Sequence, residues 1–157
     1  MKNEYLNIYN NLIKLTRNKS LYHNLKNDDT FSDRLIILLL HLGFFLKTYK
    51  DSLSKEHAQD LFDFIIRQIE LSIREIGYGD VSVNKKMKDY VNLFYSILEK
   101  IENWDIIDTS KKTKLIGDLM NIKDDNVSFI EYFDKYRQFL SKNSLKNFTK
   151  DILEFKF

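Results

Sequence analysis

Apolar residues recur at helical spacing along nearly all of this chain, and one glycine-containing passage interrupts the longest part of that pattern. Gly77 and Gly79, two of the chain's four glycines, stand there within three residues of each other. Glycine destabilises a helix interior and is favoured where the backbone φ is positive. The passage from Arg74 to Lys88 therefore predicts a shaped corner between two helices, which serves either as a packing device or as a recognition surface.

The helices on the two sides of this corner are expected to be antiparallel neighbours. Residues 55–76 carry apolar side chains mainly on one face, and the same pattern returns from Met87 to about Trp104. By contrast, residues 31–49 are apolar nearly all round. This pattern predicts that residues 31–49 form the central, buried helix.

Weaker patterns predict a first helix and a cap for the central one. Apolar residues between Tyr5 and Leu15 have amphipathic spacing. The polar turn at residues 27–30 supplies side-chain oxygens that are expected to cap the helix that follows.

Beyond residue 104 the pattern is weaker but still helical. Thr109 or Ser110 is expected to cap a short helix. Ser128 and Glu131 have the spacing of a capping box ahead of another helix. A last short helix is expected to use four apolar residues, namely Leu145, Phe148, Ile152 and Phe155.

Composition supports this helical interpretation and limits the function classes. The 157 residues include no proline and no cysteine, so disulfides, thiolate metal sites and a cysteine nucleophile are excluded. Lys and Arg number 25 against 23 Asp and Glu, which leaves a net charge of +2 and predicts no specific DNA binding. No alternating run predicts a strand. The expected fold class is all-α, a single compact domain over residues 1–157 with six or seven helices.

The start of the chain and its longest apolar run indicate the cellular compartment in which the protein is expected. Residues 1–5 lack both the apolar core of a signal peptide and the Arg-rich character of a transit peptide. The run from Leu35 to Leu46 contains His41 and is much shorter than the roughly 20 residues that span a bilayer. We expect a cytoplasmic protein.

Arg34 and His41 interrupt the apolar helix two turns apart on one face, and Thr48 follows a further two turns along. One interpretation is a buried network in which Asp63 or Glu75 supplies acceptors and fixes the order of the helices. The other is recognition of a client protein. His41 alone also has an ordinary interpretation, as a core histidine bonded through its ring nitrogens.

At the corner, Gly77 is expected to end one helix in a left-handed conformation, and Asp80 or Ser82 to cap the next. Three lysines would then lie at the start of that helix, where they oppose its dipole. Such cations invite an anionic partner, which could be RNA phosphate, an anionic lipid headgroup or an acidic protein loop. A solvated charge run is the alternative. The candidate binding residues here are Arg74, Asp80, Lys85, Lys86 and Lys88, with Gly77 and Gly79 shaping the surface.

An enzyme is the main competing class. The three histidines have no metal-ligand spacing, and neither a glycine-rich phosphate loop nor a nucleophile elbow is present. The glycine pair follows a predicted helix rather than a strand, so it is no dinucleotide fingerprint. We therefore expect no catalytic residue, no metal and no cofactor. A catalytic alternative would place Asp63, Glu75 and Asp80 around His41.

An ordered series of short motifs carries a family resemblance. In sequence order it comprises Arg17-Asn18, Leu21-Tyr22, Asp29-Thr30-Phe31, Asp33-Arg34, Leu39-Leu40-His41, Gln59-Asp60-Leu61-Phe62-Asp63, Ile73-Arg74-Glu75-Ile76-Gly77-Tyr78-Gly79-Asp80-Val81, Lys85-Lys86-Met87-Lys88 and Phe94-Tyr95. This series resembles the ubiquinol-cytochrome c chaperone family, whose hallmark runs close to LREMGVGDL-V-PKRMKK in one-letter code. The chain departs from the family at Lys19 and Asn84, where proline is usual, and at Asp33, where a small residue is usual.

The resemblance covers about residues 12–104 and leaves residues 105–157 unmatched. It implies an assembly chaperone for the cytochrome bc1 complex, with newly made cytochrome b or another bc1 intermediate as client. It also implies a small helical partner protein, and peripheral contact with the ribosome or with the inner face of the respiratory membrane. A structural or adaptor subunit of a membrane-associated complex and a helical enzyme remain as alternatives.

Overall fold

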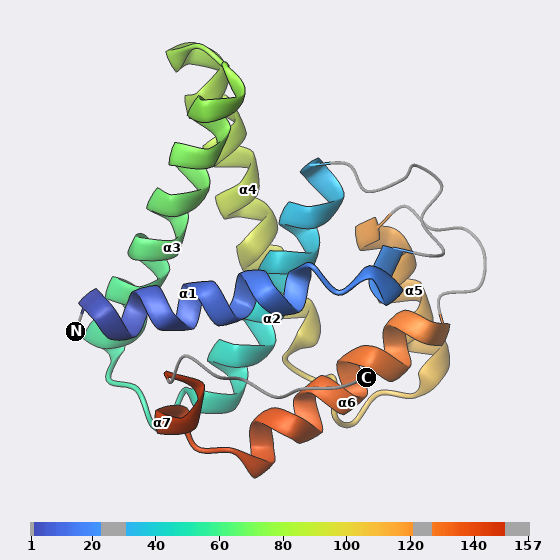
Figure 1. Ribbon diagram of the computed structural model, residues 1–157. Helices are drawn as coiled ribbons and strands as arrows, with labels where there is room; N and C mark the ends of the chain where they lie inside the picture. The colour runs from blue at the N-terminus through green and yellow to red at the C-terminus, as the bar shows by residue number, and fades with distance from the viewer. Residues whose placement is uncertain (1, 23–30, 121–126, 150–157) are drawn as a thin grey trace.

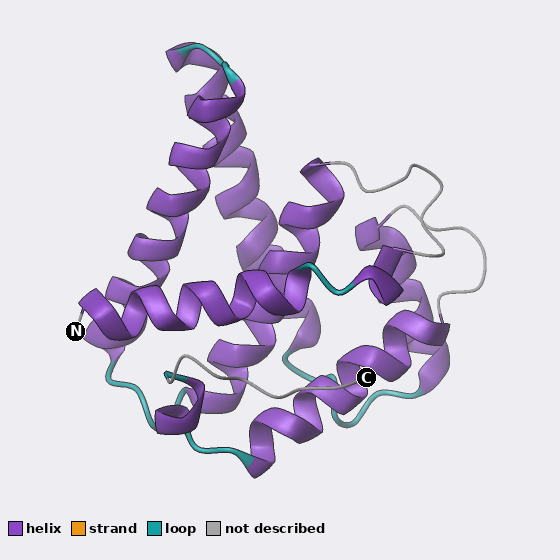
Figure 2. Ribbon diagram, in the orientation of Figure 1, coloured by secondary structure: helices purple, strands orange, loops and turns teal. Residues whose placement is uncertain are grey.

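The computed structural model describes residues 2–22, 31–120 and 127–149, and every regular element in them is a helix (Figures 1 and 2). The all-α prediction is confirmed, with seven α-helices and one 3₁₀ turn over these residues. The elements are α1 (Lys2–Thr16), the 3₁₀ turn η1 (Lys19–Tyr22), α2 (Phe31–Tyr49), α3 (Lys55–Ile76), α4 (Asp80–Ile101), α5 (Thr109–Met120), α6 (Val127–Lys142) and α7 (Leu145–Phe148).

Helix α2 is the centre of the fold, as its apolar sequence predicts. It packs against α1, α4, α5 and α6. Every residue from Ile37 to Phe45 is buried. A helix without a polar face has no side to turn toward water, and burial among other helices is its stable arrangement.

Helices α3 and α4 form an antiparallel hairpin, which confirms the expected pairing. Each presents one apolar stripe to the interior, with Leu61, Ile65, Ile69 and Ile73 on α3 and Val83, Phe94, Ile97 and Ile101 on α4. The base of the hairpin packs on the other helices, whereas its far end extends beyond them (Figure 1). Between Val83 and Phe94, α4 has no buried residue.

One glycine sets how closely α2 and α4 approach. A Cβ atom on Gly43 would lie 3.1 Å from Cδ1 of Ile101 and 3.2 Å from Cγ2 of Ile97. These separations are shorter than ordinary van der Waals contacts. Gly43 therefore permits the tight crossing through which the hairpin is anchored to the central helix.

The C-terminal helices close the opposite side of α2. Trp104 is buried, and its indole N–H donates to Oδ1 of Asp134 on α6 over 2.8 Å. The side-chain amide of Asn11 on α1 donates to the Phe148 carbonyl on α7 over 2.7 Å. Residues distant in sequence are thus joined around the same central helix.

Two predicted caps in the C-terminal region are wrong. The side chain of Asp108, rather than that of Thr109 or Ser110, accepts from the Lys111 N–H and caps α5. Ser128 lies inside α6, which begins at Val127. In the first case a carboxylate one residue upstream is an equally good acceptor, and sequence spacing alone does not choose between neighbouring polar residues.

The last predicted helix is described only in part. Ser144 caps it by accepting from the Asn147 N–H, and α7 contains Leu145 and Phe148 as expected. Ile152 and Phe155, together with the cap predicted at residues 27–30, lie outside the described residues.

Within the described ranges, no helix has the length and apolar character needed to cross a bilayer.

Candidate functional site

The tip of the α3–α4 hairpin is the candidate site that the sequence singles out, and Gly77 shapes it. Gly77 ends α3 with φ 109° and ψ 12°, and its N–H donates to the Arg74 carbonyl. This left-handed backbone is the conformation predicted for a glycine at this position. Gly79 differs, because its φ of −74° suits any residue and no atom lies within 4 Å of a Cβ placed there.

Arg74 and Asp80 join the two helices across the tip. The Asp80 carboxylate accepts from Nη1 of Arg74 over 2.5 Å, and Nη2 of Arg74 lies 3.4 Å from Oε1 of Glu70. The prediction that Asp80 or Ser82 caps α4 is wrong, because the cap position is Gly79 and no side chain bonds there. Asp80 is instead the first helical residue, where its charge still interacts favourably with the helix dipole.

The lysines after the tip lie farther along α4 than predicted. Since α4 begins at Asp80, Lys85 is its sixth residue, and the dipole effect is confined to about the first turn. The predicted opposition between these lysines and the dipole is therefore wrong. Lys85 and Lys88 are exposed, whereas the Lys86 ammonium lies 4.6 Å from the ring centre of Tyr78.

Three apolar side chains at the tip are exposed to solvent, and the sequence interpretation did not predict this. Ile76 is 53% exposed, Tyr78 43% and Val81 86%. The apolar face predicted for residues 55–76 continues to Ile76, but the helix extends past the body of the protein before it ends (Figure 1). Exposed apolar side chains that lie together beside cations are typical of interaction surfaces.

His41 lies in the core and not at a binding surface. It is fully buried, with Nδ1 2.8 Å from the Ile37 carbonyl and Nε2 2.6 Å from the Tyr132 hydroxyl. A carbonyl only accepts, so Nδ1 carries the proton and Nε2 accepts from Tyr132. Burial, opposed in part by the bond to Ile37, lowers the pKa of His41 to about 3. The ring is therefore neutral, and the expected core histidine is confirmed.

The predicted buried network of Arg34, His41 and a carboxylate is wrong. Arg34 is exposed in the first turn of α2, about 10 Å along the helix axis from His41. Asp63 is exposed and accepts instead from Gln59 on its own helix. The hydrogen-bond partners described for His41 include no carboxylate, so the geometry does not assemble the catalytic alternative either.

Arg34 lines a groove between α1, α2 and α3 that the sequence did not reveal. Its lining residues come from four separate segments, and their polar members lie within ordinary amphipathic patterns. A surface of this kind depends on how the helices cross. Across the described residues, no group of three or more His, Cys, Asp or Glu side chains is arranged to hold a metal ion.

The comparison with family models finds one match over the segment that contains the tip. The model described as ubiquinol-cytochrome C chaperone matches residues 23–104, just over half of the chain. The match includes α2 and the whole α3–α4 hairpin, and it ends at Trp104. No curated protein and no solved structure matches the chain.

Proposed function

Because the chain belongs to the ubiquinol-cytochrome C chaperone family, we propose that it is an assembly chaperone for the cytochrome bc1 complex. Its proposed client is newly made cytochrome b or another bc1 intermediate. A small helical partner protein and a position at the inner face of the respiratory membrane belong to the same proposal.

The observation that carries this proposal is the family match over a hairpin whose tip exposes apolar and basic side chains. Ile76, Tyr78 and Val81 supply an apolar contact, and Lys85 and Lys88 supply exposed positive charge beside it. An apolar client segment with acidic neighbours would be complementary to both. The tip is therefore the proposed client-binding surface.

The other residues at the tip have supporting roles in this proposal. The ion pair between Arg74 and Asp80 ties the two helices together, so both are positioning residues. Gly77 supplies the turn, and Lys86 packs on Tyr78 and holds its ring. His41 stabilises the core, because a fully buried ring does not reach a client.

Deletion of the gene tests the function as a whole. We expect the deletion strain to lose assembled bc1 complex and its b-type haem, while a respiratory complex without cytochrome b is unchanged. Native gels of membranes measure the assembled complexes, and reduced-minus-oxidised spectra measure the b-type haem. Normal bc1 levels would refute the proposal. A protein that remains in the mature complex at one copy per complex would indicate a structural subunit instead.

Charge reversal at the tip tests the proposed surface. Lys85→Glu with Lys88→Glu alters two exposed side chains and is expected to reduce co-purification of bc1 intermediates at least fivefold. Lys100→Glu with Lys114→Glu is the matched control, because both lysines are exposed and lie away from the tip. Undiminished capture by the tip variant at wild-type helicity would exclude this surface.

A further inference from the structure

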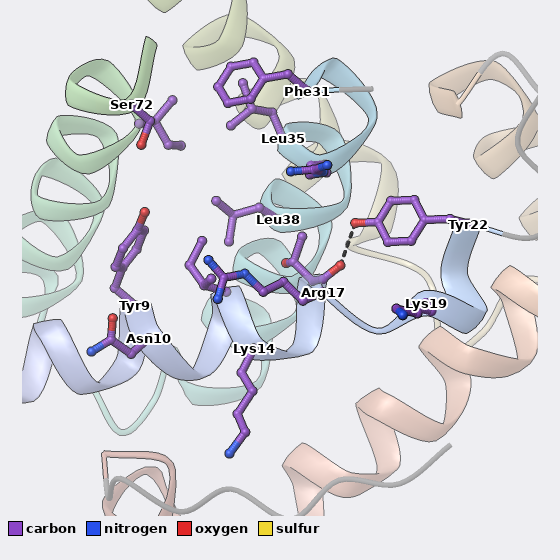
Figure 3. Close-up of a pocket in the computed structure, with 14 residues that line it drawn as sticks. Tyr9, Asn10, Lys14, Arg17, Lys19, Tyr22, Phe31, Leu35, Leu38 and Ser72 are labelled. Carbon is purple, nitrogen blue, oxygen red and sulfur yellow. Dashed lines mark hydrogen bonds between the residues drawn. The ribbon is translucent and has the colours of Figure 1, made fainter. Parts of the chain in front are cut away.

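A second surface lies at the side of the molecule, in the groove between α1, α2 and α3 (Figure 3). Its volume is about 930 Å³. That value lies within the range of small-molecule sites, roughly 300–1,000 Å³. The same volume would hold only about two turns of an α-helix that is roughly 10 Å across. Its size therefore favours a thin ligand over a helical peptide.

The inner wall of the groove is apolar. Leu35 and Leu38 line it from α2, Ile69 from α3 and Ile13 from α1. Phe31 extends this wall toward the start of α2 (Figure 3). A ligand that lies along these side chains would remove apolar surface from water, which favours a hydrocarbon chain.

The charge at the groove is positive. Lys14, Arg17, Lys19 and Arg34 are among its lining residues, and no Asp or Glu is among those that the structure describes there. Figure 3 shows the Arg17 side chain extending into the space beside Leu38, whereas Lys14 extends away from it. Arg17 is exposed, so a guanidinium is available to a ligand at the edge of the apolar wall.

Two hydroxyl-bearing side chains from α1 and α3 also line the groove. Tyr9 and Ser72 lie there on α1 and α3, facing the same space (Figure 3). Tyr22 is already engaged, because its hydroxyl donates to the Thr16 carbonyl. The Ser72 hydroxyl is engaged in the same way, because it donates to the Gln68 carbonyl. The groove thus combines an apolar wall with cations at its edge.

We propose that this groove binds a single-chain anionic amphiphile, with its carboxylate or phosphate head at Arg17 and its acyl chain along Leu35, Leu38 and Ile69. Positive charge next to an apolar wall is complementary to a ligand that has an anion at one end and a hydrocarbon at the other. This inference does not depend on the proposed client, because it concerns the isolated protein and a different face.

Isothermal titration with monomeric oleate, below its micelle concentration, tests the proposal. We expect one site per chain with a micromolar Kd. Oleoyl lysophosphatidate is expected to bind within tenfold of oleate, because it carries the same chain and an anionic head. Oleoyl lysophosphatidylcholine, with the same chain and a zwitterionic head, is expected to bind at least tenfold more weakly, and inorganic phosphate, which lacks the chain, not to bind at all.

Substitutions in the groove test whether oleate binds there. Arg17→Glu is expected to weaken oleate binding at least tenfold, and Lys114→Glu, an equal charge change on α5, less than twofold. Ser72→Trp would fill the groove and is expected to weaken binding tenfold without a charge change. Circular dichroism would show that each variant retains wild-type helicity.

Three outcomes would overturn the proposal. One is the absence of oleate binding to the wild-type chain. Another is equal affinity for the anionic and zwitterionic amphiphiles together with an unaffected Arg17→Glu variant. The third is displacement of oleate by an acidic amphipathic peptide that binds more tightly, which would assign the groove to a protein partner.

Discussion

The His41 imidazole shows how a single buried residue makes stability depend on pH. Its ring donates to the Ile37 carbonyl and accepts from Tyr132, and the Tyr136 hydroxyl donates to the His41 carbonyl. The core thus holds the neutral ring by hydrogen bonds on both nitrogens. A proton on Nε2 would remove the acceptor that Tyr132 uses and place a charge in the apolar interior.

The first prediction is acid destabilisation that depends on His41. The pKa is about 3 in the folded chain and about 6.5 when unfolded, so the unfolded state binds more protons between these values. Stability is therefore complete above about pH 6.5 and falls as the pH decreases toward 3. From pH 7.5 to 4.5 we expect this group to cost about 2–3 kcal/mol.

Urea unfolding of the wild-type chain and of His41→Gln at both pH values measures this cost. The wild-type loss between the two should exceed the loss in the variant by that amount. His23 and His57 are common to both chains and cancel in the comparison. If the free energy of unfolding changed equally with pH in both chains, His41 would not titrate as described.

The two tip glycines are predicted to respond oppositely to substitution. Gly77→Ala places a side chain at φ 109° and should lower the free energy of unfolding by about 1–2 kcal/mol. Gly79→Ser keeps an ordinary φ and supplies the side-chain cap that α4 lacks, which should raise it by a few tenths of a kcal/mol. Thermal melts of both variants measure these changes in stability. Equal destabilisation would contradict the left-handed conformation of Gly77 and the ordinary conformation of Gly79.

At the scale of elements, the hairpin combines a fixed base with an exposed end. Its base crosses α2 closely at Gly43, and at its far end Arg74 pairs with Asp80 while Lys86 packs on Tyr78. A projecting hairpin of this kind presents its tip without rearranging the core. This geometry is consistent with a recognition role for the tip and a scaffold role for the rest.

The crossing at Gly43 gives a prediction for the packing of two helices. Gly43→Leu would drive side-chain atoms into Ile97 and Ile101 and should destabilise the chain by about 1–3 kcal/mol. Gly79→Leu is a glycine control, because nothing lies within 4 Å of a Cβ added at Gly79, and it should change stability less. Chemical denaturation of both variants measures the difference. A fully tolerated Gly43→Leu would mean that α2 and α4 can separate without cost.

For the whole molecule, we propose that residues 1–157 form one cooperative unit, although the family match ends at Trp104. Tyr132 and Tyr136 on α6 bond to His41 on α2, and Asp105 bonds to Arg137 while lying near Lys47. The C-terminal helices therefore cover the centre of the family-matched region. Without them, a large part of the apolar surface of α2 would face water.

This arrangement predicts coincident unfolding. Trp104 fluorescence reports on the junction with α6, and far-ultraviolet circular dichroism reports on all helices. Both should give the same midpoint in urea. A chain truncated after residue 104 should show broad, non-cooperative melting because α2 loses the cover of α5 and α6. Separate midpoints, or a cooperative truncated chain, would indicate two units.

Local pattern was sufficient for the helices, for the left-handed turn at Gly77 and for the family. The bounds of α2 and α3 follow from apolar spacing and from the breaks beside it, since these depend on residues only a few positions apart. Caps were harder, because neighbouring polar residues compete for the same N–H groups, as at Asp108. Even so, each of these features is local in sequence.

Only the tertiary structure decided which polar and apolar residues are accessible. Arg34 and His41 share one helix face, yet the first is exposed and the second is enclosed by α6. Ile76 continues an apolar stripe but lies beyond the body that buries it. The groove depends on the spacing of three helices from distant segments. Exposure depends on which elements cover a residue, and that is a property of the crossing of helices far apart in sequence.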